Sequence, residues 1–235
     1  MKLGILKTGG PPPQLIEPYG DYPAMFRRLL GEGAFDYATY DVEAGQLPAD
    51  VQACAGYVIT GSPASAYDEA AWIDELKAFL QAAKGRAALV GVCFGHQIMA
   101  EAFGGRVEKS ANGWGVGLHD YEVHAAPPWM DPVRHVRAPA SHQDQVVQPP
   151  PGAEVIAASP FSPFGMLAYR DQPAISIQLH PEFEPDYAKA LIETRRSRRI
   201  PEAAAVQAIA SLDGTDDRGR LGEWIRRFLA SPPGL

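Results

Sequence analysis

One cysteine in the sequence stands at a position typical of a nucleophile. Cys93 follows the apolar run 88–92, has Gly91 and Gly95 two residues away on either side, and is followed at once by a helical pattern. A buried strand that turns directly into a helix at such a residue is the thiol counterpart of the G-x-S-x-G elbow. The sharp turn excludes bulky neighbours, and the dipole at the start of the helix favours the thiolate. The pattern predicts a reactive thiol, with the Phe94 amide pointing to where a tetrahedral oxyanion would form.

A thiol nucleophile needs a base, and one of the six histidines is placed for that role. His180 follows the apolar run 175–179, which predicts a buried strand, and Pro181 and Glu182 come next. Residues two apart project to the same side of an extended chain, so Glu182 can orient the His180 ring. We therefore predict Cys93, His180 and Glu182 as nucleophile, base and orienting carboxylate.

These residues resemble the class I (triad) glutamine amidotransferase family, whose pattern is G-x-C-x-G-x-Q followed much later by H-P-E. Two more segments agree. Residues 58–63 (Val-Ile-Thr-Gly-Ser-Pro) resemble the strand-end loop that supplies the family's second oxyanion amide. Residues 141–144 (Ser-His-Gln-Asp) are similar to the S-H-x-D segment in the glutaminase half of GMP synthase. The sequence is thus similar to a stand-alone member of the GMP synthase glutaminase type.

The resemblance implies a reaction and a set of site residues. Cys93 would attack the γ-carboxamide of glutamine, form a γ-glutamyl thioester and release ammonia, while His180 serves as base and then acid. Ser62 departs from the family pattern, because many members carry a second glycine there. No cofactor and no metal site is predicted. The implied oxyanion amides are Phe94 and Ser62 or Gly61, and the implied contacts to the glutamine main-chain groups are Gln97, Ser141, His142 and Asp144.

Short strand-like runs alternate with longer helical patterns in the first half of the chain, and these elements must position the residues named above. Such alternation predicts a mostly parallel sheet with helices on both faces. Residues 114–180 show strand-like runs, residues 146–147 among them, which predict an antiparallel extension of the same sheet. We expect an α/β, flavodoxin-like three-layer sandwich formed by a single domain over residues 1–235. The expected first-half strands are 2–6, 35–42, 57–60 and 87–92, and the expected helices are 22–30, 68–83, 94–103, 185–199, 201–212 and 218–230.

Composition narrows the classes of protein. Hydrophobic residues make up 46% and charged residues 21%, which excludes collagen-like, disordered and coiled-coil chains. The net charge of −7 gives no general attraction to nucleic acid or to an anionic membrane. Two cysteines form no disulfide framework, and with no signal or membrane segment we expect a cytoplasmic location. We interpret the basic run 195–199 as the solvated end of a helix, and the glycine-rich residues 113–117 and the proline-rich residues 11–13 as loops.

Three functions remain open. The chain contains no segment resembling a synthetase, so the first is a stand-alone glutamine amidotransferase-like enzyme to which a synthetase subunit could dock. The second is a γ-glutamyl peptidase that acts on glutathione-like peptides or conjugates. The third is a non-catalytic partner or binding module that retains the fold. A peptidase needs a cleft that opens beyond Cys93 towards Trp114 and residues 127–132, whereas an amidotransferase needs only a closed, glutamine-sized pocket. We expect a small-molecule substrate, glutamine or a γ-glutamyl compound, and no nucleic-acid or membrane partner.

Overall fold

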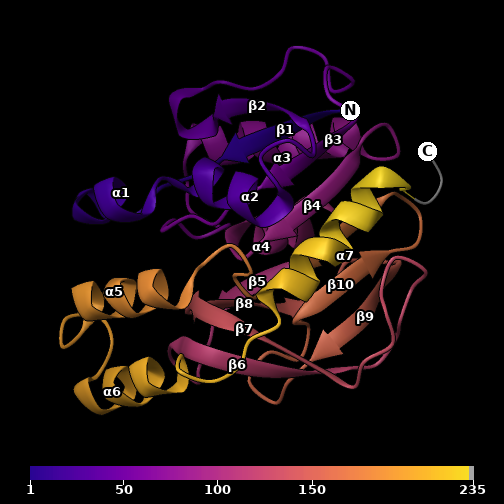
Figure 1. The fold of residues 1–235 in the computed structure, drawn as a ribbon. Helices are drawn as coiled ribbons and strands as arrows, with labels where there is room; N and C mark the ends of the chain where they lie inside the picture. The colour runs from indigo at the N-terminus through magenta and orange to yellow at the C-terminus, as the bar shows by residue number, and fades with distance from the viewer. Residues whose placement is uncertain (233–235) are drawn as a thin grey trace.

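The strands of this computed structural model, which describes residues 1–232, fall into two sheets. Within that part of the chain the larger sheet has nine strands in the order β2-β1-β3-β4-β11-β10-β9-β6-β7 (Figure 1). Neighbours from β2 to β11 are parallel, and neighbours from β11 to β7 are antiparallel. The predicted parallel sheet with an antiparallel extension is confirmed. The strands are β1 (Lys2–Lys7), β2 (Asp36–Asp41), β3 (Gly56–Ile59), β4 (Ala88–Val92), β6 (Gly115–Val123), β7 (His135–His142), β9 (Ala153–Ala158), β10 (Met166–Tyr169) and β11 (Ala174–Ile177).

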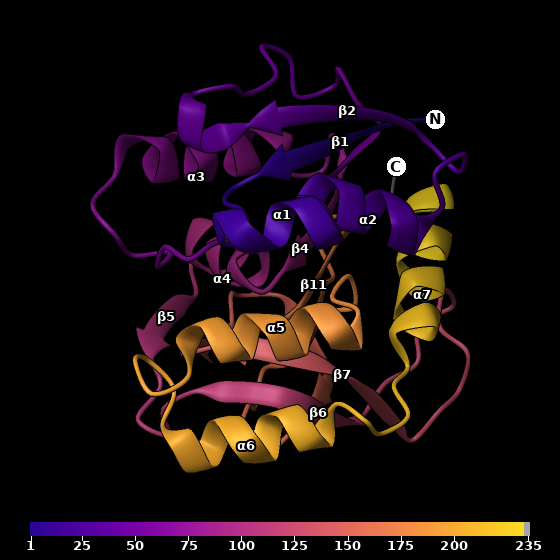
Figure 2. The same cartoon turned by 60° about the vertical axis from the view of Figure 1, so that its left-hand side comes forward.

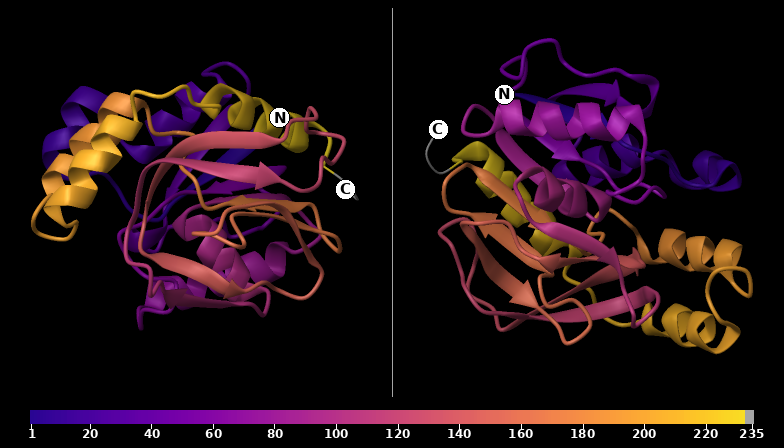
Figure 3. Two further views of the ribbon diagram at one scale, coloured as in Figure 1. Left: turned by 90° about the horizontal axis from the view of Figure 1, so that it is seen from below. Right: turned by 180° about the vertical axis from the view of Figure 1, so that it is seen from behind.

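Helices cover both faces of this sheet, as predicted. One face packs against α2 and α7, and the other against α3 and α4 (Figure 3). A helical pair, α5 and α6, lies along β6 and β7, and α1 contacts α5 (Figure 2). No helix within residues 1–232 is long and apolar enough to cross a lipid bilayer. The helices are α1 (Pro13–Tyr19), α2 (Tyr22–Leu30), α3 (Ala71–Ala83), α4 (Phe94–Ala102), α5 (Pro185–Arg195), α6 (Glu202–Ser211) and α7 (Arg218–Ala230), with a short 3-10 turn at Val42–Ala44.

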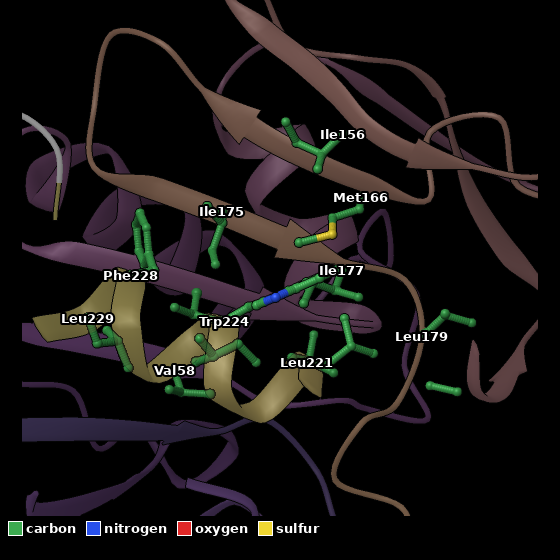
Figure 4. Packing of buried hydrophobic residues seen from close by; sticks show 14 of the residues in the cluster. Val58, Ile156, Met166, Ile175, Ile177, Leu179, Leu221, Trp224, Phe228 and Leu229 are labelled. Carbon is green, nitrogen blue, oxygen red and sulfur yellow. The ribbon is translucent and has the colours of Figure 1, made fainter. Parts of the chain in front are cut away.

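The largest hydrophobic cluster lies between α7 and the sheet. Trp224 is fully buried there, beside Val58 of β3 and the β11 residues Ile175 and Ile177 (Figure 4). Its indole Nε1 donates a 2.6 Å hydrogen bond to Oδ1 of Asp131, so the one polar atom of the ring has a partner. This packing holds β3, β4 and β11 together beneath the edge where the predicted site residues follow the strands.

Three local expectations are wrong. Residues 146–147 belong to β8 (Asp144–Gln148), which pairs with β5 (Arg106–Lys109) in a separate two-stranded sheet. The proline-rich N-terminal segment is partly the helix α1, because a proline at the first helical position lacks only an N–H that the helix does not use. The glycine-rich segment 113–117 is a strand from Gly115 onwards.

The two glycines of the elbow allow α4 to lie directly on the sheet. A Cβ at Gly91 would overlap the carbonyl of Gly95 and approach the sulfur of Met99 to 2.6 Å. A Cβ at Gly95 would overlap the carbonyl oxygen of Ile59 in β3. Because these obstacles are mostly backbone, a side chain at either position must displace α4 from β3 and β4.

We predict that Gly91→Ala and Gly95→Ala each lower the free energy of unfolding by about 1–3 kcal/mol, the usual cost of overpacking. Chemical denaturation followed by circular dichroism measures the change. Gly33→Ala is the matched control, because nothing lies within 4 Å of its added Cβ. Elbow variants as stable as the control would show that the close approach of α4 is not required.

Candidate active site

Cys93 occupies the junction between β4 and α4 with a backbone that few non-glycine residues adopt. Its φ is 53° and its ψ is −103°, a strained conformation of the kind that is found at nucleophile elbows. The amide of Cys93 donates a 2.8 Å hydrogen bond to the carbonyl of Ile177 in β11, and its carbonyl accepts one of 3.0 Å from Gln97. The predicted position of Cys93 at a sharp strand-to-helix turn is confirmed. The hydrogen bonds to β11 and within α4 hold this turn in place.

His180 and Glu182 meet directly beside this turn. The His180 Nδ1 lies 2.7 Å from Oε1 of Glu182, and both side chains are buried. Because a carboxylate only accepts, Nδ1 carries the proton, and Nε2 is the nitrogen left for a thiol proton. Cys93 and the same imidazole lie on one side of Gly61, where an added Cβ would be 3.0 Å from Cε1 of His180 and 3.9 Å from Cβ of Cys93. Phe183 stacks on the ring at 3.9 Å between centroids and fixes its plane.

Two opposing effects determine the protonation of His180. Burial on its own lowers the pKa of the imidazole, but the negative charges of Cys93 and Glu182 and their hydrogen bonds outweigh it and raise the pKa to about 10. At neutral pH the ring is therefore an imidazolium beside Glu182. A sulfur nucleophile with a basic side chain beside it is a recurring arrangement in covalent catalysis.

Two backbone segments offer N–H groups near Cys93. Phe94 is the first residue of α4, so its N–H has no acceptor within the helix. On the other side, Ser62 lines a cavity beside Cys93, while Gly61 packs so closely on His180 that an added Cβ would lie 3.0 Å from Cε1. The Thr8 hydroxyl holds this second segment by donating to the carbonyls of Thr60 (3.0 Å) and Gly61 (3.2 Å).

A cavity of about 500 Å³ opens in front of the thiol. It opens beyond Cys93 towards Trp114, and residues 127–132 do not line it. The structure thus brings all four predicted substrate-binding residues together with the thiol. The residues that line the cavity are Ser62, Pro63, Ala64, Ser65, Tyr67, Cys93, Gln97, Lys109, Trp114, Ser141, His142, Gln143, Asp144, Arg195 and Arg199.

The four predicted substrate-binding residues differ in which hydrogen-bonding groups remain available to a ligand. The side-chain amide of Gln97 donates to the carbonyl of Asp144 (2.8 Å) and to Gln178 (3.1 Å), so only its oxygen remains for a ligand. The carboxylate of Asp144 accepts hydrogen bonds from Ser65 (2.5 Å) and Tyr67 (3.1 Å). These two hydroxyls aim the carboxylate at the cavity.

The other two residues of this set have internal partners as well. Nδ1 of His142 donates to the carbonyl of Asp144 at 3.1 Å, and burial lowers the pKa of His142 to about 3. His142 is therefore neutral and supports the turn between β7 and β8. The hydroxyl of Ser141 accepts a 2.8 Å hydrogen bond from Nη1 of Arg195.

Sequence reasoning missed part of the lining. The interpretation of residues 195–199 as a solvated helix end holds for Arg198, which is exposed, and is wrong for Arg195, which lines the cavity. Arg199 also lines it, from beyond the end of α5. The run of arginines was the available signal, but only the tertiary fold shows which of them turn inward.

We predict that the His180 ring titrates near pH 10 and that Cys93→Ala moves the midpoint lower, because the variant lacks the thiolate that favours the charged ring. Since the folded-state pKa lies above the ordinary 6.5, the stability from this charge is complete below about pH 6.5 and lost as the pH rises through about 10. NMR of the His180 ring as a function of pH measures both midpoints. Equal midpoints near 6.5 would refute the ion pair.

Comparisons with known proteins show which family the chain belongs to. Residues 22–195 match the profile of the family described as glutamine amidotransferase class-I. The chain is 28% identical to γ-glutamyl peptidase 4 of Arabidopsis thaliana over 92% of this chain and 90% of that protein. It is 32% identical to the glutamine-hydrolysing GMP synthase of Thermus thermophilus over 53% of this chain but only 24% of that enzyme. The crystal structure of a glutamine amidotransferase from Thermotoga maritima superposes with a TM-score of 0.75 at 19% identity, covering 98% of this chain and 99% of that one, and shows the same fold. The chain belongs to the class I glutamine amidotransferase family.

Proposed function

We propose that this protein hydrolyses γ-glutamyl amides through a Cys93–His180–Glu182 triad. The observation that carries the proposal is the strained φ of 53° at Cys93, at the start of a helix and beside a buried His180–Glu182 pair. Strain of this kind persists only where the surrounding structure imposes it, and it gathers at functional sites. A module that only binds ligands needs neither this backbone nor a charged imidazole.

The proposed reaction has two halves. The Cys93 thiolate attacks the γ-carbonyl carbon, and the Phe94 and Ser62 amides donate hydrogen bonds to the oxyanion. The intermediate collapses to a γ-glutamyl thioester as the His180 imidazolium protonates the departing amine. Water then attacks the thioester, His180 takes its proton, and glutamate leaves as the thiolate re-forms. Glu182 keeps the proton on Nδ1 and stabilises the imidazolium.

The γ-glutamyl group would be held by the residues around Asp144. The carboxylate of Asp144 suits the α-ammonium group of the substrate, and the free oxygen of the Gln97 amide is a further acceptor. These contacts belong to the part of the substrate that all γ-glutamyl compounds share. They do not distinguish one leaving group from another.

The leaving group is more than ammonia. A cavity of about 500 Å³ falls in the range of about 300–1,000 Å³ that holds drug-sized ligands, and it extends towards Trp114. This supports γ-glutamyl peptide hydrolysis, the activity named in a relative that matches along nearly the whole chain. A second candidate is glutamine hydrolysis that feeds ammonia to a separate synthetase, supported by the similarity to part of a GMP synthase.

We predict that Cys93→Ala and His180→Ala each reduce kcat for γ-glutamyl hydrolysis by about 10⁴-fold or more, because the two residues act as one unit. Glu182→Gln should cost less, since the carboxylate orients the ring and does not touch the substrate. Cys54→Ala is the control, because this buried thiol lies elsewhere in the core, 3.8 Å from the Tyr40 hydroxyl. Full activity in a folded Cys93→Ala variant would refute the triad.

The two candidate functions differ in the activity of the purified chain. We expect steady-state hydrolysis of glutathione to exceed that of glutamine in kcat/KM without any added protein, because the cavity is larger than glutamine requires. A peptidase needs no docked synthetase to complete its site. Preference for glutamine, or activity only after a second protein is added, would favour the synthetase-coupled candidate.

A further inference from the structure

Three cationic side chains line the cavity together with Cys93 and Trp114. They are Lys109 at the end of β5, Arg195 at the end of α5 and Arg199 just beyond it, and we call them the cationic cluster. Within residues 1–232 none of the three forms an ion pair with a carboxylate. The polar contact of Arg195 is the hydroxyl of Ser141, and its guanidinium lies 5.5 Å from the centre of the Trp114 ring.

A strained turn places two of these cations together. Ser197 has a φ of 58°, and apart from Cys93 it is the only non-glycine residue among the described ones with positive φ. Its conformation reverses the chain after α5, so that the Arg199 amide donates to the Arg195 carbonyl at 2.9 Å. Glu202 accepts hydrogen bonds from the Ser197 hydroxyl (2.7 Å) and from Arg196 and so anchors the turn from outside.

The charges of the cavity do not match a free glutamine. Among its lining residues, Asp144 is the one carboxylate and His142 is neutral. With the Cys93 thiolate of the proposed reaction also counted, the three cations leave an excess of one positive charge. This excess runs against the chain's net charge of −7. A γ-glutamyl head is zwitterionic, with one ammonium and one carboxylate, and it leaves the excess uncompensated. A substrate with a second carboxylate reduces it.

We propose that the cationic cluster binds a carboxylate on the leaving-group side, so that the preferred substrates are γ-glutamyl compounds whose departing amine carries a carboxylate. The inference rests on the proposed function and adds the residues that select the leaving group. Arg195, partly buried and aligned against Trp114, presents the planar fork that suits a carboxylate. Arg199 and Lys109 are exposed and add charge at the entrance.

The test uses two substrates that differ only at this group, γ-glutamylglycine and γ-glutamylglycinamide. We expect the wild-type ratio of their kcat/KM values to favour the carboxylate by about tenfold or more, equivalent to about 1.4 kcal/mol. Arg199→Gln and Lys109→Gln should each lower the ratio, and the double variant should bring it close to one. The ratio cancels effects on the shared γ-glutamyl head. Arg198→Gln is the matched control from the same basic run, because Arg198 is exposed outside the cavity, and it should keep the ratio.

Each outcome decides the inference. A wild-type ratio near one, or a ratio that survives the double variant, would overturn it. An equal loss on both substrates and on glutamine would also overturn it, because the cations would then bind the α-carboxylate of the head. If the wild type hydrolyses no γ-glutamyl compound, the proposed function fails separately. Calorimetric binding of both dipeptides to the Cys93→Ala variant still measures the preference, and equal affinities would contradict the cluster's role.

Discussion

The buried hydrogen bond between His180 and Glu182 is the interaction on which the site depends. A charged imidazole and a carboxylate are costly to bury unless they pair, and at 2.7 Å they do. The pair is supported from behind by aromatic packing: Phe183 stacks on His180 and makes an edge contact with Tyr187 of α5. Tyr22, the first residue of α2, lies against Phe183 as well. Two helices that are distant in sequence, α2 and α5, thus support the Phe183 ring that stacks on His180.

The parallel part of the sheet brings the reacting groups to one edge. The pairs Val92–Ile177 and Gly91–Ile59 set the registers of β4 with β11 and with β3, so the segments that follow these strands emerge side by side. Such edges, at the carboxyl ends of parallel strands, are where open α/β sheets bind ligands. The antiparallel extension is inserted between β4 and β11 in sequence, and it adds the turn around Asp144 to the same cavity.

The central elements, and the meeting of Cys93 with the His180–Glu182 pair at one edge of the sheet, could be predicted from sequence because their signals are local. The run before Cys93 is apolar, its glycines mark a close approach, and His180 ends a second apolar run. The β5–β8 pair could not be predicted, because Val146 and Val147 look alike whichever sheet they join, and pairing depends on contacts distant in sequence. The position of Arg195 was hidden for a similar reason. A basic residue at a helix end usually faces water, and only the docking of α5 on β7 brings it against Ser141.

The site is divided between two kinds of support. Thr8, Thr60, Cys93 and His180 belong to or directly follow central strands, where opening one element means disrupting the largest cores. Trp114 directly precedes β6, Arg195 ends α5, and Arg199 lies in the turn beyond it. All three positions can change with little effect on those cores. Substitutions at the rim of the cavity therefore have little effect on the residues at the ends of the central strands. In evolutionary terms, the rim of the cavity can change by drift while the strand ends around Cys93 are inherited unchanged.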